Sequence, residues 1–155
     1  MLFNAAGRLT ARADRSHRQY VDERGWVSHD LDEIYANVLA VCRDVVKKAG
    51  IDPVQIAAFG ISNQRETVAA WDKADGTPVG QAIVWQCARA KEICDALTDH
   101  ADMVQEKTGL PLSPYFSAPK MAWILQNCPE AAALAQQGRL ALGTIDSYLV
   151  YRLSG

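Results

Sequence analysis

The sequence has no long apolar run and no recognisable targeting segment. A helix that crosses a membrane needs about 18 to 20 consecutive apolar residues, and no stretch of the 155 residues approaches that length. A secretory signal peptide begins with basic residues followed by an apolar segment, whereas this chain begins MLFNAAGRLTAR. We therefore expect no membrane partner and a location in the cytoplasm.

Cysteine and histidine are scarce, and neither has the spacing of a metal site. The four cysteines form no CxxC pair, so no zinc site is predicted. If one helix carried both Cys87 and Cys94, they would lie about 10 Å apart along it, which is too far for a disulfide. The three histidines also fall in no ligand spacing. We expect no metal ligands, and reduced, mostly buried thiols as in cytoplasmic proteins.

An excess of charge of either sign is missing as well. Lysine and arginine together number 16, against 18 for aspartate and glutamate. Binding to nucleic acid relies on clustered basic residues that neutralise phosphates, so we expect no nucleic-acid partner. The near balance does not favour a strongly charged substrate either.

The residues that are present predict one α/β domain, because 155 residues can bury a single sizeable core. Apolar spacing predicts a helix that begins after Asp30, with Glu33 completing a capping-box pattern, and that ends at Gly50. Helices and strands alternate along the chain, which indicates a mixed sheet with flanking helices. In the first half of the chain we also expect a strand–turn–strand opening, a loop at 22–30, a buried strand at 56–61 and a hairpin around Asp75-Gly76. In the second half we expect helices at 89–97, before Gly109, after Pro119 and after Pro129. A strand at 140–144 and a final helix are the last expected elements.

A cluster of polar residues follows the expected strand at 56–61. The continuous apolar run IAAFGI is typical of a buried parallel strand, and the run Ser62 to Glu66 follows it. Ligands in open α/β sheets lie beyond the carboxyl ends of the strands. Arg65 offers a fork of donors and an ionised Glu66 only accepts, so together they suit a neutral group with vicinal hydroxyls.

Trp85 ends the second arm of the expected hairpin, and a tryptophan face can cover the C–H side of a polyol. Each of these features also has a simpler explanation. Arg65 and Glu66 could be a solvated loop pair that contributes little, Trp85 could be core packing, and the segment SPYFS could be a structural loop. Composition and spacing alone make a polyol site only one candidate.

Three stretches nevertheless resemble a known family. GISNQRETVAAWDKADGTPVGQAIVWQCARA, TGLPLSPYFSAPKMAWIL and LALGTIDSYLVYRLSG are similar to the N-terminal domain of the glycerol kinases, in the FGGY family of carbohydrate kinases. The resemblance covers nearly the whole chain, and NQRET followed by IVWQ is its most specific part. It implies an actin/hexokinase-type (ribonuclease H-like) ATPase fold and transfer of the ATP γ-phosphoryl group to a primary hydroxyl with Mg²⁺.

The resemblance also implies roles for individual residues. Arg65 and Glu66 match the arginine and glutamate that hydrogen-bond the glycerol hydroxyls. Trp85 matches the tryptophan that packs on the glycerol carbons, and Tyr115 matches a third side chain that binds a hydroxyl. Two departures, Ala88 after the WQC sequence and Ala118-Pro119 where the family often has Gly-Thr, leave a related polyol or sugar open as the substrate.

Two family features are not found between residues 1 and 155: the first strand, whose D-x-G-T loop holds the ATP phosphates and magnesium, and the catalytic aspartate. We therefore expect residues 1–155 to be a partial FGGY N-terminal domain that supplies the polyol-binding side chains, with no catalytic residue of its own. ATP and Mg²⁺ are expected only with the complete enzyme. A non-catalytic polyol-binding or interaction module is the alternative, and the apolar 56–61 edge suggests a homo-oligomer.

Overall fold

A five-stranded sheet organises the chain, and the computed structural model describes all of residues 1–155. The order of its strands is β3-β4-β6-β5-β7, and a separate two-stranded hairpin, β1-β2, lies at the far end of α1. The strand bounds are β1 Leu2–Phe3, β2 Leu9–Ala11, β3 Gln19–Val21, β4 Val27–His29, β5 Val68–Asp72, β6 Ala82–Ile83 and β7 Leu140–Thr144.

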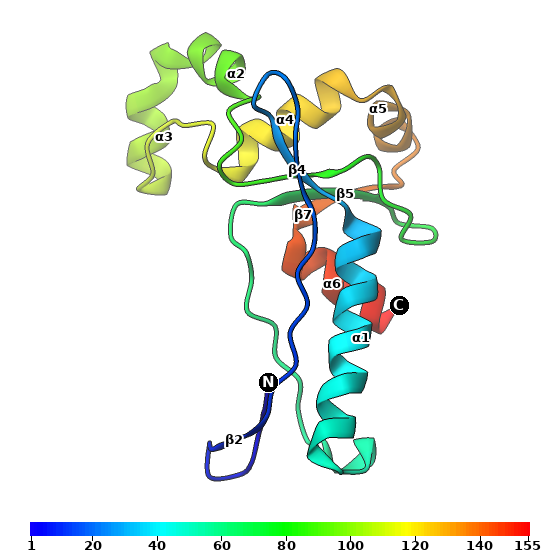
Figure 1. The fold of residues 1–155 in the computed structure, drawn as a ribbon. Helices are drawn as coiled ribbons and strands as arrows, with labels where there is room; N and C mark the ends of the chain where they lie inside the picture. Colours follow the sequence, from blue (N-terminus) through cyan, green and yellow to red (C-terminus); the bar gives the residue numbers. More distant parts are fainter.

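Helices cover both faces of this sheet (Figure 1). α1 and α6 lie on one face, and α4 and α5 lie on the other, with α2 and α3 beyond α4. The sheet and its two helical layers confirm the expected α/β class with flanking helices. The helical bounds are α1 Leu31–Ala49, η1 Pro53–Gln55, α2 Lys91–Ala96, η2 Thr98–His100, α3 Ala101–Thr108, α4 Ser117–Asn127, α5 Pro129–Gln136 and α6 Ile145–Ser154.

α1 begins and ends where its sequence predicts. The Asp30 side chain accepts a hydrogen bond from the Glu33 amide at 2.9 Å, which satisfies one of the free N–H groups of the first turn. The reciprocal half of a capping box is absent, because the Glu33 carboxylate accepts from the Arg18 amide instead. Gly50 ends the helix with φ 64°, a left-handed conformation that glycine adopts without steric conflict.

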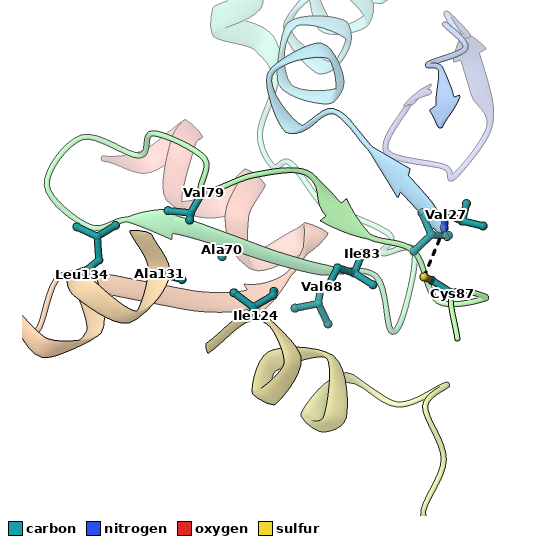
Figure 2. Close-up of a cluster of buried hydrophobic side chains, with 10 residues drawn as sticks. Val27, Val68, Ala70, Val79, Ile83, Cys87, Ile124, Ala131 and Leu134 are labelled. Carbon is teal, nitrogen blue, oxygen red and sulfur yellow. Dashed lines mark hydrogen bonds between the residues drawn. The ribbon is translucent and has the colours of Figure 1, made fainter. Parts of the chain in front are cut away.

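The core lies in two clusters, one on each face of the sheet. Figure 2 shows the cluster beneath α4 and α5, in which Val68 and Ala70 of β5 meet Ile124 of α4 and Leu134 of α5. The second cluster joins the opposite face of β5, through Ala69 and Trp71, to α1 and α6. Alternate residues of β5 therefore point to opposite layers, as a strand requires.

The predicted hairpin is confirmed. Val68 pairs with Ile83 and Trp71 forms a bridge with Pro78, while the Asp75 side chain accepts from the Thr77 amide at 2.8 Å in the connecting turn. Arg139, just before β7, donates to the Asp72 carboxylate at the end of β5. β5 is thus held between β6 and β7, and all five of its residues are buried.

The expected buried strand at 56–61 does not form. Residues 56–61 have no strand pairing, and all of them except the half-buried Ile61 are exposed. From Ala57 to Glu66 no backbone group hydrogen-bonds to another backbone group. A β-strand exists only where a neighbouring strand satisfies its backbone, and here no strand lies beside this segment, which runs as an extended connection beside α1 (Figure 1).

Two further expectations were wrong. The loop expected at 22–30 contains β4, whose three residues are buried between β3 and β6. The sheet is also not mixed, because every strand pair in it is antiparallel. The one segment expected to be a parallel strand, 56–61, lies outside the sheet, and β4 takes a place in it. None of the helices has the length and apolar character to cross a bilayer.

Candidate functional site

The predicted site gathers around the turn that precedes β5. Arg65 and Glu66 form this turn, so they lie before a buried strand and not after one. Glu66 has φ 62° and is the only residue other than glycine with a positive φ. This left-handed conformation is uncommon for a glutamate and strained relative to the right-handed region. Glu66 is therefore held in place by its surroundings.

The Glu66 carboxylate is anchored from α4. The Ser117 hydroxyl, at the first position of that helix, donates to Glu66 Oε2 at 2.7 Å. The other carboxylate oxygen accepts no hydrogen bond. One oxygen is thus oriented by the protein, while the other remains an acceptor for a ligand hydroxyl.

Trp85 and Tyr115 pack against each other, and the segments that carry them are hydrogen-bonded to the Glu66 turn. Their ring centroids are 5.9 Å apart with an interplanar angle of 64°, an edge-to-face arrangement that aromatic pairs favour. The Trp85 amide donates to the buried Thr67 hydroxyl at 3.3 Å, which ties the end of the β6 arm to the Glu66 turn. Trp85 is 40% exposed and Tyr115 is 41% exposed, so neither side chain is core packing alone.

Arg65 is adjacent to Glu66 in the chain but does not pair with it. The Arg65 side chain is exposed, and it takes part in none of the ion pairs of the chain. Its five donors are therefore free. The structure brings Glu66, Trp85 and Tyr115 together from three segments and leaves Arg65 at their edge without a partner.

Asn63 fixes the start of the same turn. Its side-chain oxygen accepts from the Asp146 amide at 3.2 Å, at the first turn of α6. The Thr144 hydroxyl, at the end of β7, donates to the Asp146 carboxylate. The polar run Ser62 to Glu66 is thus joined to β7 and α6 at one end and to α4 at the other.

A buried lysine lies beneath the site. Lys120, on the first turn of α4, has no exposed surface and donates from Nζ to the carbonyl of Tyr115 and, at 3.3 Å, to that of Phe116. Removal from water lowers the pKa of Lys120 to about 8, and the negative charge of Glu66 opposes part of that shift. Lys120 therefore hydrogen-bonds the main chain of Tyr115 and is influenced by the charge of Glu66, two of the predicted site residues.

Sequence reasoning assigned no role to Thr67, Ser117 and Lys120, although it quoted the motifs that contain them. Lys120 carried a usable signal, because it falls four residues before Ile124 and thus on the buried face of α4. A lone cation on an apolar helix face must find polar partners inside the protein. Ser117 and Thr67 gave no such signal, since a hydroxyl at a helix start or before a strand usually serves the backbone.

A separate cavity of about 290 Å³ lies behind this site, between α2, α3 and α4. Its lining is mostly apolar and includes Ile93, Leu97, Val104 and Phe116. Such a lining does not suit a polyol, which needs several hydrogen-bonding partners. We therefore assign the polar cluster around Glu66, and not this cavity, as the candidate site.

The chain does not assemble a metal centre. No group of three or more histidine, cysteine, aspartate or glutamate side chains is arranged to hold an ion, and all four cysteines are free. Cys87 and Cys94 are buried and the other two cysteines are partly buried, much as expected.

Comparison with known proteins gives one consistent family. The sequence model of the FGGY family of carbohydrate kinases, N-terminal domain, matches residues 1–155. The chain is 48% identical to the glycerol kinase of Ectopseudomonas mendocina (strain ymp), over 100% of this chain and 32% of that protein. It is 46% identical to the glycerol kinase of Alcanivorax borkumensis, over 99% of this chain and 31% of that protein.

Solved structures agree with this. The crystal structure of Plasmodium falciparum glycerol kinase with ADP superposes with a TM-score of 0.82 and 34% identity, over 90% of this chain and 28% of that chain. Gluconate kinase from Lactobacillus acidophilus superposes with a TM-score of 0.73 at 23% identity, over 89% of this chain and 27% of that chain, which shows a shared fold. These neighbours are sugar kinases with the actin/hexokinase-type fold, as expected.

The chain spans about a third of the length of the curated relatives it matches. Within that span the agreement extends from the first residue to the last. The chain therefore belongs to the FGGY family of carbohydrate kinases, and it matches the N-terminal domain of that family.

Proposed function

We propose that residues 1–155 form the polyol-binding part of an ATP-dependent glycerol kinase, which transfers the ATP γ-phosphoryl group to a primary hydroxyl. The observation that carries this proposal is the convergence of Glu66, Trp85 and Tyr115 from three separate segments. The similarity to glycerol kinases over the whole chain supports the same substrate class.

The chemistry of the cluster suits a short neutral polyol. Glu66 has one carboxylate oxygen free to accept from a hydroxyl, and Arg65 has unpaired donors beside it. Trp85 offers an apolar face to the C–H side of the ligand, while the Tyr115 hydroxyl can donate or accept. One acidic and one basic side chain would face the ligand, which favours a neutral polyol over a phosphate or carboxylate.

In this proposal the domain 1–155 binds and orients the acceptor, and no catalytic residue lies within it. Phosphoryl transfer depends on positioning and on charges around the phosphates, and we assign ATP and Mg²⁺ to the complete enzyme. ATP, when bound, supplies the phosphoryl group, and what this chain contributes is the orientation of the accepting hydroxyl. We place the enzyme in the cytoplasm, where ATP is available.

A panel of acceptors tests the substrate. We expect the complete enzyme to phosphorylate glycerol with a higher kcat/KM than longer polyols, pentuloses or gluconate. The panel should be run with ATP and Mg²⁺, with ADP release as the readout. A pentulose preferred over glycerol by a wide margin would show that the substrate is a different small sugar.

An assay of the isolated chain distinguishes the proposed division of roles in an enzyme from the alternative function, a non-catalytic polyol-binding module. We expect the purified residues 1–155 to release no ADP in a glycerol-dependent manner, because no phosphate-binding loop or base has been found among them. If the complete protein is also inactive but binds glycerol by calorimetry, the module is the correct assignment. Glycerol-dependent turnover by the purified 155 residues would contradict the division of roles proposed here.

We also propose that the chain forms a homo-oligomer. The support is the exposed apolar segment at 56–61, whose backbone groups have no strand partner. Exposed strand-like segments with unpaired backbone groups favour pairing with another chain.

A further inference from the structure

The strongest unexplained feature near the site is Lys120. Lysine is among the residues least often fully buried, because its ammonium group loses hydration unless it is paired. Lys120 nevertheless has no exposed surface, and it is not within ion-pair distance of any carboxylate. Its hydrogen-bond partners are two main-chain carbonyls.

The hydrogen bonds of Lys120 go to the main chain of the segment that carries Tyr115. Its Nζ donates to the main-chain carbonyl of Tyr115 and to that of Phe116, and lies 5.9 Å from the centre of the Tyr115 ring. These carbonyls belong to the segment immediately before α4. No side chain caps the N-terminus of α4. Lys120 therefore restrains the backbone from which the Tyr115 ring projects toward Trp85.

The negative charge of Glu66 also acts on Lys120. The titratable groups that act on it are Glu66 from the turn before β5, Cys87 from the segment after β6, and Cys94 from α2. Burial raises the pKa of the Cys94 thiol, and of the three neighbouring groups Glu66 acts most strongly on Lys120. Ser117, one turn earlier on the same helix face, holds the Glu66 carboxylate directly.

We propose that Lys120 is a positioning residue of the polyol site, which fixes the main chain that carries Tyr115. The first turn of α4 thereby sets both walls of the site, Tyr115 through Lys120 and Glu66 through Ser117. This inference rests on the proposed function insofar as the ligand is a polyol. It assigns Lys120 no contact with the substrate.

The variant Lys120→Met tests this in the complete enzyme, because methionine keeps the length of the side chain and removes its charge and donors. We expect KM for glycerol to rise at least tenfold, while KM for ATP changes less than twofold. Lys120→Arg, which keeps the charge and the donors, should restore part of the glycerol affinity. Lys107→Met, on the exposed face of α3, is the control and should leave both constants unchanged.

A second measurement does not depend on activity. In the NMR spectrum of the same proteins, we expect nuclear Overhauser contacts between the Tyr115 and Trp85 rings in the wild type and their loss in Lys120→Met. If the wild type shows these contacts but does not phosphorylate glycerol, the proposed function fails while the positioning role stands. Retention of the contacts together with an unchanged KM for glycerol in Lys120→Met would overturn the inference.

The pH dependence of the wild type covers the case in which Lys120→Met fails to fold. The charge of Lys120 is present below its pKa of about 8 and is lost above it. We therefore expect KM for glycerol to rise as pH increases from 7 to 9.5, with a midpoint near 8, while KM for ATP follows a different profile. A glycerol KM that is flat over this range would contradict a role for the Lys120 charge.

Discussion

The unusual conformation of Glu66 is the clearest sign of function at the scale of single residues. A glutamate with φ 62° loses of the order of 1 kcal/mol relative to its preferred backbone region. Other interactions must offset this, and the Ser117 hydroxyl is the contact in place to do so. Strained residues tend to gather at functional sites, and in the proposed site the unbonded Glu66 oxygen would face a ligand hydroxyl.

Removal of either charge next to the ligand should impair the complete enzyme. Arg65→Ala removes donors from an exposed side chain without other partners, so the fold should be unaffected. Loss of a charged hydrogen bond to a desolvated substrate hydroxyl costs roughly 2 to 4 kcal/mol, or about 30- to 1000-fold in kcat/KM. Glu66→Ala should act similarly, and Trp85→Ala should chiefly raise KM for glycerol.

Steady-state kinetics with glycerol measure these effects. Arg8→Ala, on the exposed turn between β1 and β2, is the control for a lost surface charge. Normal phosphorylation of glycerol by both Arg65→Ala and Glu66→Ala would show that these two side chains do not bind the substrate.

The buried Lys120 should also make stability depend on pH. Its pKa is lowered to about 8 in the fold from 10.5 in the unfolded chain. Between these values the unfolded state binds more protons than the folded state, so this group makes the free energy of unfolding increase with pH. One pKa unit corresponds to about 1.4 kcal/mol, which gives a total of roughly 3 kcal/mol across the interval.

Denaturant unfolding of the wild type and Lys120→Met at pH 7 and pH 10 isolates this contribution, because the variant carries every other titrating group. The stability of the wild type relative to the variant should improve by roughly 1 to 3 kcal/mol between the two pH values. An unchanged difference would show that Lys120 has an ordinary pKa in the fold.

At the scale of elements, α1 shows how local signals place a helix against the sheet. Its N-cap at Asp30 follows β4 directly, and Leu31 and Ile34 are buried in the first turn. The cap fixes the point at which the chain leaves the sheet, and the apolar face then packs against β5 and α6. The position of the whole helix therefore depends on a short polar contact.

Asp30→Ala should destabilise the domain by about 1 kcal/mol, the usual effect of removing an N-cap side chain. Asp30→Asn, which keeps an acceptor of the same size, should cost only a few tenths of that amount. Thermal and denaturant unfolding of the two variants give the comparison. Equal destabilisation of the two variants would show that the negative charge of Asp30, and not its capping hydrogen bond, stabilises the domain.

At the scale of the whole molecule, an apolar groove accompanies the unpaired segment 56–61. The groove has a volume of about 580 Å³ and is lined by side chains from β1, α1 and residues 56–62. Phe59, which lines it, is 63% exposed. Apolar area without cover and backbone groups without partners favour association of one copy with another.

We expect the isolated chain to self-associate as its concentration rises, or to melt without a cooperative transition. Phe59→Glu should weaken the association, because it places a charge in the apolar contact. Val54→Glu is the matched control, since Val54 is 83% exposed and does not line the groove. Sedimentation and thermal melting measure both properties, and a monomer with a sharp melting transition would show that the proposed homo-oligomer is wrong.

The sequence by itself determined those elements whose signals are local. The cap at Asp30, the Asp75-Gly76 turn and the proline at the start of α5 depend on residues a few positions apart, and the structure confirms each. The motifs around Glu66, Trp85 and Tyr115 also identified the family, because resemblance depends on residue identity and not on packing.

Only the tertiary structure decided which segments pair and what surrounds each side chain. The apolar run at 56–61 has the composition of a buried strand but stays outside the sheet, because no neighbouring strand satisfies its backbone. β4 enters the sheet although its sequence resembles a loop, because β3 and β6 lie on either side of it. The positions of Ser117 and Lys120 beneath Glu66 depend on how α4 packs against the turn before β5, and such contacts between distant segments leave no periodic trace in the chain.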